Sequence, residues 1–416
     1  MRCSFSFELN ELVDLGLRYP RGVSVDPALK RPIYLDHHST TPVDPRVLEA
    51  MLPWWSEDFG NAASHTHVYG WRAEAAVEDA RERIAGALGA EAREIVFTSG
   101  ATESNNLAIL GAADAGRVRG RHVVTVETEH PAVLDPCRAL EEEGWEVTRL
   151  AVESNGLLDL TRVASALRED TVLLSAMAAN NETGVIQPIE ALSAMCRDRG
   201  VLFHSDAAQA AGRIPLDVSG ENVDLLSLSA HKLYGPKGVG ALFVRRRRPR
   251  VRLVPRLLGG GHEGGLRAGT LPVPLIVGMA RALELCVQEQ ATEQPRLADL
   301  RRGLHDRIQQ ALPGVRLNGD AEHRLAGNLN LSFEDVDGAR LLLALHGIAV
   351  SSGSACASAQ PAPSHVLRAM GVPDSLARAS LRFGLGRSTT AEDVQRAAEI
   401  VIEAVRGIRG VGEDAS

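Results

Sequence analysis

The 416-residue sequence contains no apolar run long enough to cross a membrane, so we expect no membrane span. Its first thirty residues lack the basic and then apolar layout of a secretory signal. They carry four acidic residues, Glu8, Glu11, Asp14 and Asp26, which argues against a transit peptide. We therefore expect a cytoplasmic protein, and we treat residues 1–32 as an extension without an assigned role.

Cysteine is scarce, with five residues in the chain: Cys3, Cys137, Cys196, Cys286 and Cys356. The odd number, the wide spacing and the lack of a secretory signal argue against a disulfide framework, and no Cys/His spacing fits a zinc site. Cys137, Cys196 and Cys286 lie in helical patterns, where we expect them to be small buried hydrophobes. Cys356 differs, because it lies in SSGSACASAQPAPS with no large side chain nearby. Such surroundings favour an accessible, reactive thiol.

The sequence also lacks an excess of positive charge. A formal net charge of -8 argues against a protein that binds nucleic acid non-specifically. The basic stretch RRRRPR, residues 245–250, directly follows the apolar run GALFV. We interpret this stretch as the solvated end of a strand.

The middle of the chain alternates short apolar runs with helical patterns such as GWRAEAAVEDARERIAGALG. The runs are rich in Val, Leu and Ile without polar alternation, which is typical of strands covered on both faces. Six of them predict strands: EIVFTSG, RHVVTVETEH, TVLLSAMAANN, VLFHSDAAQ, DLLSLSAHK and GALFV. This order predicts an α/β fold with a mostly parallel sheet. After about residue 288 the pattern changes to helix, strand, helix, short strand, the Cys356 segment and a last helix, which predicts a smaller α+β domain.

Polar side chains follow five of these runs, where the strands should end. They are Thr98 to Thr102, Glu129 with His130, Asn180 with Asn181, Asp206 with Gln209, and His231 with Lys232. Ligands of open α/β sheets bind beyond the carboxyl ends of the strands. Each group alone has a structural explanation, such as a helix cap for Thr102. Together they predict one site for a phosphate, a ring and a protonated ring nitrogen.

The phosphate would bind where Ser-Gly-Ala-Thr opens a helix, because free backbone N–H groups and the helix dipole attract an anion there. Ser229 and His231 can add donors. The segment has neither the Gly-Lys-Ser/Thr ending of a P-loop nor the G-x-G-x-x-G spacing of a dinucleotide site. The sequence therefore predicts a phosphorylated cofactor that is not a nucleotide.

Lysine is the scarcest basic residue, since 42 of the 45 basic residues are arginines and the lysines are Lys30, Lys232 and Lys237. Lys232 follows a buried strand, where an unpaired cation is costly. An amine can lose its proton and form a Schiff base, whereas arginine cannot. Lys232 is thus the predicted attachment point for pyridoxal phosphate (PLP), and Lys237 is the competing candidate. Asp206 would pair with the PLP ring nitrogen, and His130 would cover the ring.

Ten stretches together resemble the PLP-dependent cysteine desulfurases of the class-V aminotransferase group, in the branch of IscS and NifS. They are IYLDHHSTTPVDPRV, FGNAASHTHVYGW, EIVFTSGATESNNLAI, TEHPAVL, NNETGVIQP, HSDAAQAAG, SLSAHKLYGPKGVGAL, GGGHEGGLRAGTLPVP, VSSGSACAS and LRFGLGR. They run in the family's order from about residue 33 to about residue 388.

The resemblance implies the type I fold of PLP-dependent transferases, with a large domain built on a mostly parallel seven-stranded sheet covered by helices. Residues 46–288 would form this PLP-binding domain. Residues 33–45 and 289–416 would form the small domain, including the catalytic cysteine loop at about 351–364. The resemblance further implies that the protein forms a homodimer and converts L-cysteine to L-alanine. It would pass the sulfur to an acceptor, such as an iron–sulfur scaffold or a tRNA-thiolation protein.

The resemblance also implies residue roles. Catalysis would rest on Cys356, Lys232 and His130. The cofactor would be bound by Ala101, Thr102, Asn181, Asp206, Gln209, Ser229, His231 and Lys232, and by Thr270 of the neighbouring subunit. Arg382 and Asn181 would bind the substrate carboxylate. No resident metal is implied, although Cys356 could ligate an iron–sulfur cluster transiently, and we interpret the paired His37 and His38 as a local variation.

Two alternatives stay open at the level of sequence. Another PLP enzyme on this fold, an aminotransferase or a selenocysteine lyase, would use Lys232, Asp206 and His130 equally well. Cys356 in SSGSAC favours desulfuration over both. A non-catalytic sulfur-relay or regulatory relative is the alternative from a different class, and a purified protein without the visible absorbance of PLP would support it.

Overall fold

The computed structural model describes residues 31–220, 223–247, 250–352 and 363–410. The chain divides into residues 1–32 and residues 33–416. Of the first unit only Arg31 and Pro32 are described; both are exposed and lie outside helices and strands. Cys3 and Cys356 lie outside the described residues.

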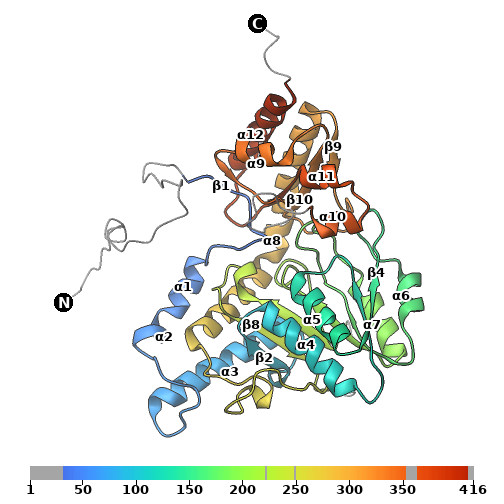
Figure 1. The fold of residues 1–416 in the computed structure, drawn as a ribbon. Coiled ribbons are helices and arrows are strands. Elements are labelled where there is room, and N and C mark those ends of the chain that lie inside the picture. Colours follow the sequence, from blue (N-terminus) through green and yellow to red (C-terminus); the bar gives the residue numbers. More distant parts are fainter. Residues whose placement is uncertain (1–30, 221–222, 248–249, 353–362, 411–416) are drawn as a thin grey trace, which may run out of the picture. The chain divides into compact units, whose positions relative to one another are not determined.

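A seven-stranded sheet forms the centre of the larger region, in the order β2-β8-β7-β6-β5-β3-β4 (Figure 1). Only β8 runs antiparallel to its neighbours. The strands are β2 (Ile95–Thr98), β3 (His122–Val126), β4 (Glu146–Leu150), β5 (Thr171–Ser175), β6 (Leu202–Asp206), β7 (Leu225–Ser229) and β8 (Gly240–Val244). The expected α/β fold with a mostly parallel seven-stranded sheet is confirmed.

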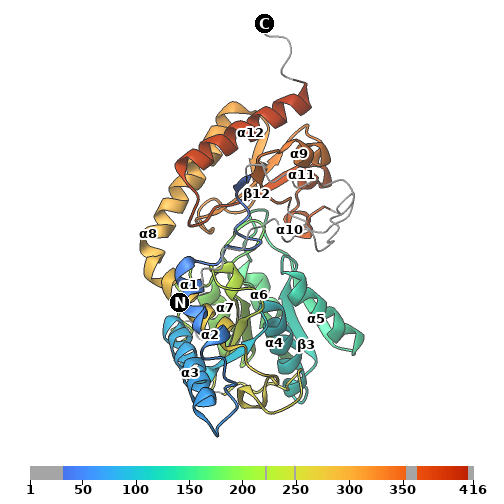
Figure 2. The ribbon, with the colours of Figure 1, turned by 90° about the vertical axis from the view of Figure 1, so that its left-hand side faces the viewer.

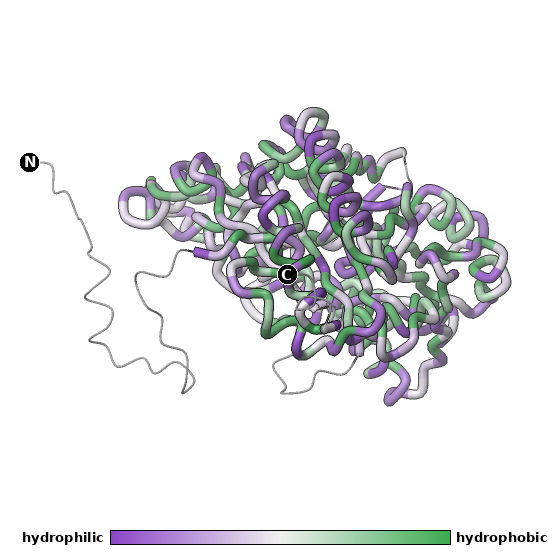
Figure 3. Tube along the Cα trace, turned by 90° about the horizontal axis from the view of Figure 1, so that it is seen from above, coloured by the Kyte–Doolittle hydropathy of each residue, from purple (hydrophilic) through white to green (hydrophobic). Residues whose placement is uncertain are grey.

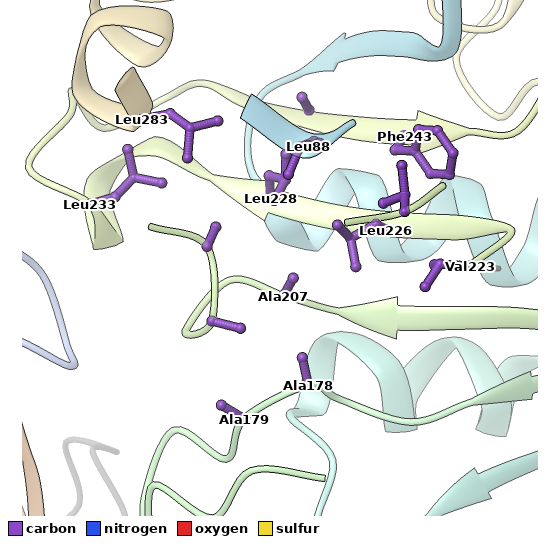
Figure 4. Packing of buried hydrophobic residues seen from close by; sticks show 14 of the residues in the cluster. Leu88, Ala178, Ala179, Ala207, Val223, Leu226, Leu228, Leu233, Phe243 and Leu283 are labelled. Carbon is purple, nitrogen blue, oxygen red and sulfur yellow. The ribbon is translucent and has the colours of Figure 1, made fainter. Parts of the chain in front are cut away.

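Both faces of this sheet are buried, because successive side chains along a strand point to opposite sides. Leu226 and Phe243 pack in one core with helices α3, α7 and α8, whereas Leu225 and Leu242 pack in another core with α4 and α5. Figure 4 shows the first core at Leu226 and Phe243. The helices are α3 (Val68–Leu88), α4 (Ala101–Gly116), α5 (Pro131–Glu142), α7 (Ile189–Asp198) and α8 (Val273–Ala311).

A second group of strands follows in the C-terminal region. Strands β9 (Val315–Leu317), β10 (Asn328–Phe333) and β12 (Ser380–Gly384) form an antiparallel sheet, and β1 (Ile33–Tyr34) pairs in parallel with β11 (Ile348–Ala349). Around them lie α9 (Gly338–Ala344), α10 (His365–Ala369), α11 (Asp374–Arg378) and α12 (Ala391–Arg409). Leu331, Phe383 and Val401 belong to their separate core. The predicted order of strand, helix and short strand corresponds to β10, α9 and β11.

Helix α8 has 39 residues and contributes to two cores. Ile276 packs in the core of the large sheet, and Leu304 packs in the core of the C-terminal region. Figure 2 shows α8 passing from the helices of the large sheet to α12. The helix continues through Pro295. The predicted boundary at residue 288 therefore falls inside one helix, and the division into two domains stays a prediction.

The remaining elements are short. They are α1 (Pro45–Met51), α2 (Pro53–Ser56), α6 (Leu160–Ala166) and the 3-10 turns η2 (Ala92–Glu94), η3 (Ala230–Lys232) and η4 (Glu263–Gly265). Hydrophobic and hydrophilic residues alternate along the helices (Figure 3), as expected where one helical face packs and the other meets solvent. No helix of the described residues is long and apolar enough to span a membrane.

Candidate active site

A cavity of about 990 Å³ lies where the parallel strands end, and most of the predicted site residues line it. Those residues are Ala101, Thr102, His130, Asn181, Asp206, Gln209, Ser229, His231, Lys232 and Arg382. The first nine come from the ends of β6 and β7 or from the segments that follow β2, β3, β5, β6 and β7, and Arg382 comes from β12. The large sheet and the C-terminal region thus both contribute to one cavity.

Lys232 lies in η3, directly after β7. Its Nζ donates to the backbone oxygens of His38, at 2.8 Å, and Ser39, at 2.6 Å. Burial, followed by the positive charges of Arg382 and Arg213, lowers the pKa of Lys232 to about 8. The amine therefore loses its proton more readily than an ordinary lysine, as a Schiff-base lysine must. Lys237 also lines the cavity, so position alone does not separate the two lysines.

The lowered pKa of Lys232 has a measurable consequence. In the apoprotein, modification of Lys232 by an amine-directed reagent should reach half its maximum rate near pH 8, because the neutral amine is the nucleophile. In the unfolded chain the same lysine should have its midpoint at about pH 10.4. Mass spectrometry of the Lys232 peptide after brief labelling across pH 6–11 measures both values. Equal midpoints in the folded and unfolded chains would contradict this assignment.

Asp206 is the last residue of β6 and is buried. Its Oδ2 accepts from Asn105 Nδ2 at 2.7 Å, and its Oδ1 accepts from the Ala208 N–H at 2.9 Å. Each oxygen therefore has a fixed donor, which orients the carboxylate in the cavity wall. Sequence reasoning did not assign Asn105, although it lies one turn after the Ser-Gly-Ala-Thr segment.

The start of α4 offers backbone donors to an anion. Its N-cap, Gly100, makes no side-chain capping bond, so the first N–H groups of α4 lack that partner. Gly100 has φ 151°, a conformation that side-chain-bearing residues rarely adopt. Nearby, His231 Nδ1 lies 3.1 Å from Thr40 Oγ1. Burial, then Lys232 and Lys237, lowers the pKa of His231 to about 4, so its ring is neutral.

His130 caps the start of α5. Its Nδ1 accepts from the Ala132 N–H at 3.1 Å. Burial lowers the pKa of His130, and although Asp206 pulls the pKa upward, Lys232 and His365 lower it further. With Nδ1 acting as the acceptor, the neutral ring carries its proton on Nε2. His130 can therefore hold or move a proton at Nε2.

Three amide and guanidinium groups complete the wall. Gln209 has a partner at each end of its amide, because its Nε2 donates to the His38 oxygen at 2.9 Å and its Oε1 accepts from Arg213 at 2.6 Å. Asn181 Oδ1 and Arg382 Nε, in contrast, are buried and have no hydrogen-bond partner among the described residues. Buried polar atoms are normally paired, so these two indicate that a ligand belongs here.

Several residues of the site were not singled out from the sequence. Asp36 and Ser39 contact Arg382 Nη2 at 2.8 and 2.6 Å. Glu182 is buried and lines the cavity; burial raises its pKa, and Ser364 Oγ donates to its Oε2 at 2.5 Å. Asp36 and Ser39 lie in the motif LDHHSTT and Glu182 lies in NNETG, so the motifs that carry the family resemblance contain these residues although no role was assigned to them.

Thr270 is not brought together with the other predicted residues. It is exposed and does not line the cavity. The glycine-rich segment before it is fixed by Glu263, whose carboxylate pairs with Arg81 at 2.8 Å and accepts from the Phe97 N–H at 2.7 Å. This segment and Leu271 line another cavity, of about 670 Å³.

The three described cysteines, Cys137, Cys196 and Cys286, are buried and free, as predicted. Burial raises the pKa of Cys137 to about 12 and that of Cys286 to about 11, and it raises the pKa of Cys196 as well. The thiolate is the reactive form, so these cysteines are poor nucleophiles.

The residues of the cavity fit PLP. An anion can bind at the start of α4, Asp206 can pair with a protonated ring nitrogen, and Lys232 has a lowered pKa. The unpartnered Asn181 Oδ1 adds a free polar group. Within the described part of the chain, no cluster of three or more His, Cys, Asp or Glu residues could hold a metal.

Comparisons with known proteins agree with this site. The family model described as aminotransferase class-V matches residues 33–397. A cysteine desulfurase IscS of Anaeromyxobacter sp. (strain Fw109-5) is 58% identical over 381 residues, which cover 92% of this chain and 94% of that relative. A solved structure of a NifS-like protein is 37% identical, with a TM-score of 0.84 and coverage of 90% of this chain and 100% of that one. A structure described as SspA in complex with cysteine is 39% identical, with a TM-score of 0.76 and coverage of 85% and 98%. The chain therefore belongs to the class-V aminotransferase family and, within it, to the PLP-dependent cysteine desulfurases.

Proposed function

We propose that the cavity converts L-cysteine to L-alanine and that the sulfur remains on Cys356 as a persulfide. One observation carries the proposal: Lys232, Asp206 and Arg382 line a cavity, and one flank of the Cys356 segment bonds to a lining residue while the other flank lines the cavity itself. On one flank Ser351 bonds to Arg382, and on the other Ser364 lines the cavity. Cys356 itself is four residues beyond Ser352 in the chain, outside the described residues.

Bound PLP would supply an electron sink for the carbon that loses its proton. Lys232 would carry the cofactor, and the Asp206 carboxylate would hold the proton of the ring nitrogen. The first N–H groups of α4, at Ala101 and Thr102, would bind the phosphate together with Ser229 and His231. Gln209 and Asn181 would contact the hydroxyl side of the ring.

Substrate handling would fall to residues on the facing wall. Arg382 would bind the substrate carboxylate through charge-assisted hydrogen bonds, with Asn181 assisting. Lys232 Nζ, once it is free and has lost its proton, could take a proton, and His130 Nε2, which carries one, could give a proton.

Cys356 would act on the sulfur. Its thiolate would attack the substrate sulfur, so that an S–S bond forms and the substrate C–S bond breaks. The electron pair of the broken bond would stay with carbon, which takes up a proton and becomes the methyl group of L-alanine. A persulfide is left on Cys356.

The direct test of this function is incubation of the PLP-loaded protein with L-cysteine. One L-alanine should be released for each sulfur recovered, and mass spectrometry should find the first sulfur on Cys356. A fully loaded protein that releases no L-alanine would contradict the proposal.

A homodimer and a sulfur-acceptor protein complete the proposal. Three aromatic residues in α2, in α3 and in the segment that joins them are more than half exposed: Trp55 (58%), Trp71 (55%) and Phe59 (64%). Exposed apolar groups of this size mark interaction surfaces, which supports self-association. The acceptor would be an iron–sulfur scaffold or a tRNA-thiolation protein, and the cytoplasmic location stays a prediction from the sequence.

The dimer predicts a role for Thr270. Thr270→Ala should weaken PLP retention roughly tenfold without unfolding the protein, because one hydrogen bond to a phosphate in the partner's site is lost. Dialysis against buffer without PLP, followed by absorbance, measures this loss. Thr292→Ala, at an exposed position of α8, is the control. A monomer with full PLP occupancy in solution scattering would overturn the dimer proposal.

A further inference from the structure

Asp36 lies directly beside Arg382, and neither sequence reasoning nor the proposed mechanism gives it a role. We propose that Asp36 is a positioning residue, whose carboxylate holds the Arg382 guanidinium where it can bind the α-carboxylate of the substrate. This inference rests on the proposed function, in which Arg382 binds that carboxylate.

Backbone pairing brings the two side chains together. Strand β1 pairs with β11, and just beyond β1 the residue Asp36 forms a bridge with Gly384 of β12. Just beyond β11, Ser351 forms a bridge with Arg382; the Arg382 N–H donates to the Ser351 oxygen at 2.7 Å. Asn330 of β10 pairs with Arg382 on one side of β12, so Ser351 and Asp36 both lie along the other edge of this strand, and these pairings fix where the Arg382 side chain begins.

The three guanidinium nitrogens of Arg382 have different numbers of hydrogen-bond partners. Nη2 donates to Asp36 Oδ1 at 2.8 Å, to Ser39 Oγ at 2.6 Å and to Ser351 Oγ at 3.1 Å. Nη1 donates to the Asn181 backbone oxygen at 2.9 Å. Nε has no partner among the described residues, although it is buried. The protein thus holds the guanidinium mainly through Nη2 and leaves the Nε–H without a partner among the described residues.

The positive charges around Arg382 explain why one of the acceptors of its Nη2 is a carboxylate. Arg382 and Arg213 both lower the pKa of Lys232, so three positively charged groups act on one another here. Asp36 forms the only ion pair of Arg382 within the described part of the chain, with side-chain exposures of 6% for Arg382 and 18% for Asp36. Without Asp36 the guanidinium would be repelled by its neighbours and held only by neutral acceptors. Asp36 therefore keeps Arg382 at the cavity wall.

Ser351 links the contact between Asp36 and Arg382 to the Cys356 segment. Its hydroxyl donates to Asp36 Oδ1 at 2.9 Å and accepts from Arg382 Nη2. The same carboxylate thus orients the substrate-binding arginine and the residue five positions before Cys356. Loss of the Asp36 charge should consequently affect recognition of a carboxylate more than the chemistry of the cofactor.

The test compares two ligands of the PLP-loaded protein. L-Alanine carries the α-carboxylate, whereas ethylamine is the same molecule without it. In Asp36→Asn, the L-alanine concentration that half-saturates the change in cofactor absorbance should rise about tenfold, whereas the value for ethylamine should stay within about twofold. The KM for L-cysteine should rise by a similar factor, and Asp36→Glu, which restores the charge, should recover most of the loss.

Asp224→Asn is the matched control, because Asp224 is buried and, like Asp36, pairs with an arginine; this arginine, Arg245, lies outside the cavity. This variant should lower the melting temperature without changing the ratio of the half-saturating concentrations of L-alanine and ethylamine. Equal effects of Asp36→Asn on L-alanine and ethylamine, or no effect on either, would overturn the inference.

If Asp36→Asn does not yield PLP-loaded protein, Ser39→Ala is the second variant, because it removes another acceptor of Arg382 Nη2. It should raise the half-saturating concentration of L-alanine about threefold and leave that of ethylamine unchanged. An unselective effect or no effect there would overturn the inference equally. Failure of the proposed function is distinguishable, because wild-type protein would then release no L-alanine from L-cysteine, whatever the variants bind.

Discussion

Lys232→Ala should remove both the visible absorbance of bound PLP and all measurable conversion of L-cysteine. The reason is that Lys232 supplies the amine that holds the cofactor and, when that amine is free and neutral, a group that can take the proton. Loss of proton transfer alone costs about 10²- to 10⁴-fold in rate. Absorbance after incubation with PLP and release of L-alanine measure the two effects. The variant should still fold, because a buried amine with a pKa of about 8 contributes little favourable energy when charged.

Lys237→Ala is the control for this prediction. Lys237 lines the same cavity and was the competing candidate, so the two variants remove the same chemical group from one site. Lys237→Ala should keep the absorbance of the bound cofactor. A loss of absorbance in Lys237→Ala, together with its retention in Lys232→Ala, would reverse the assignment of the Schiff-base lysine.

The part of the site that sequence reasoning predicted follows from one property of parallel sheets. Strands that run in the same direction end at the same edge, so polar residues after successive strands meet there. His130, Asn181 and Asp206 lie far apart in the chain, and the order of β3, β5 and β6 in the sheet places them in one cavity. Buried strands are also easy to predict, since continuous runs of Val, Leu and Ile indicate them directly.

Other features depend on information that is not local. Strand β4 has the mixed sequence EVTRL and lies at the sheet edge, where it is partly exposed, so no continuous apolar run marks it. The change of pattern at about residue 288 predicts a boundary there, whereas α8 continues through that position and through Pro295. Packing of its two halves in two cores favours continuity. The contact between Asp36 and Arg382 depends on the pairing of β1 with β11, which two residues of strand do not predict.

Cys356→Ser should bind PLP and L-cysteine normally and release L-alanine only at background level. Lys232, Asp206 and Arg382 are untouched, so the cofactor and the substrate carboxylate keep their partners. A serine hydroxyl has no low-pKa form and is a far poorer nucleophile toward sulfur than a thiolate. L-Alanine release with reductant present, measured beside the spectral change on adding L-cysteine, separates sulfur chemistry from binding.

The buried cysteines provide the matched controls. Cys137→Ser, Cys196→Ser and Cys286→Ser replace the same atom at sites where burial raises the thiol pKa. Each should keep most of the L-alanine release and lose about 1 kcal/mol of unfolding free energy at most. Cys3→Ser should also stay active, since sulfur chemistry is assigned to Cys356 alone.

The pattern across the five variants decides between the mechanisms left open by the sequence. An aminotransferase needs the cofactor and its lysine but no thiol, so substantial turnover of L-cysteine by Cys356→Ser would sink the desulfurase mechanism and favour that alternative. Loss of the spectral change in Cys356→Ser would instead mean that the segment helps to bind substrate. That result is physically reasonable, because Ser351 is bonded to both Asp36 and Arg382. The sulfur-accepting role is assigned to Cys356 only if Cys356→Ser keeps the spectral change on adding L-cysteine and releases L-alanine at background level.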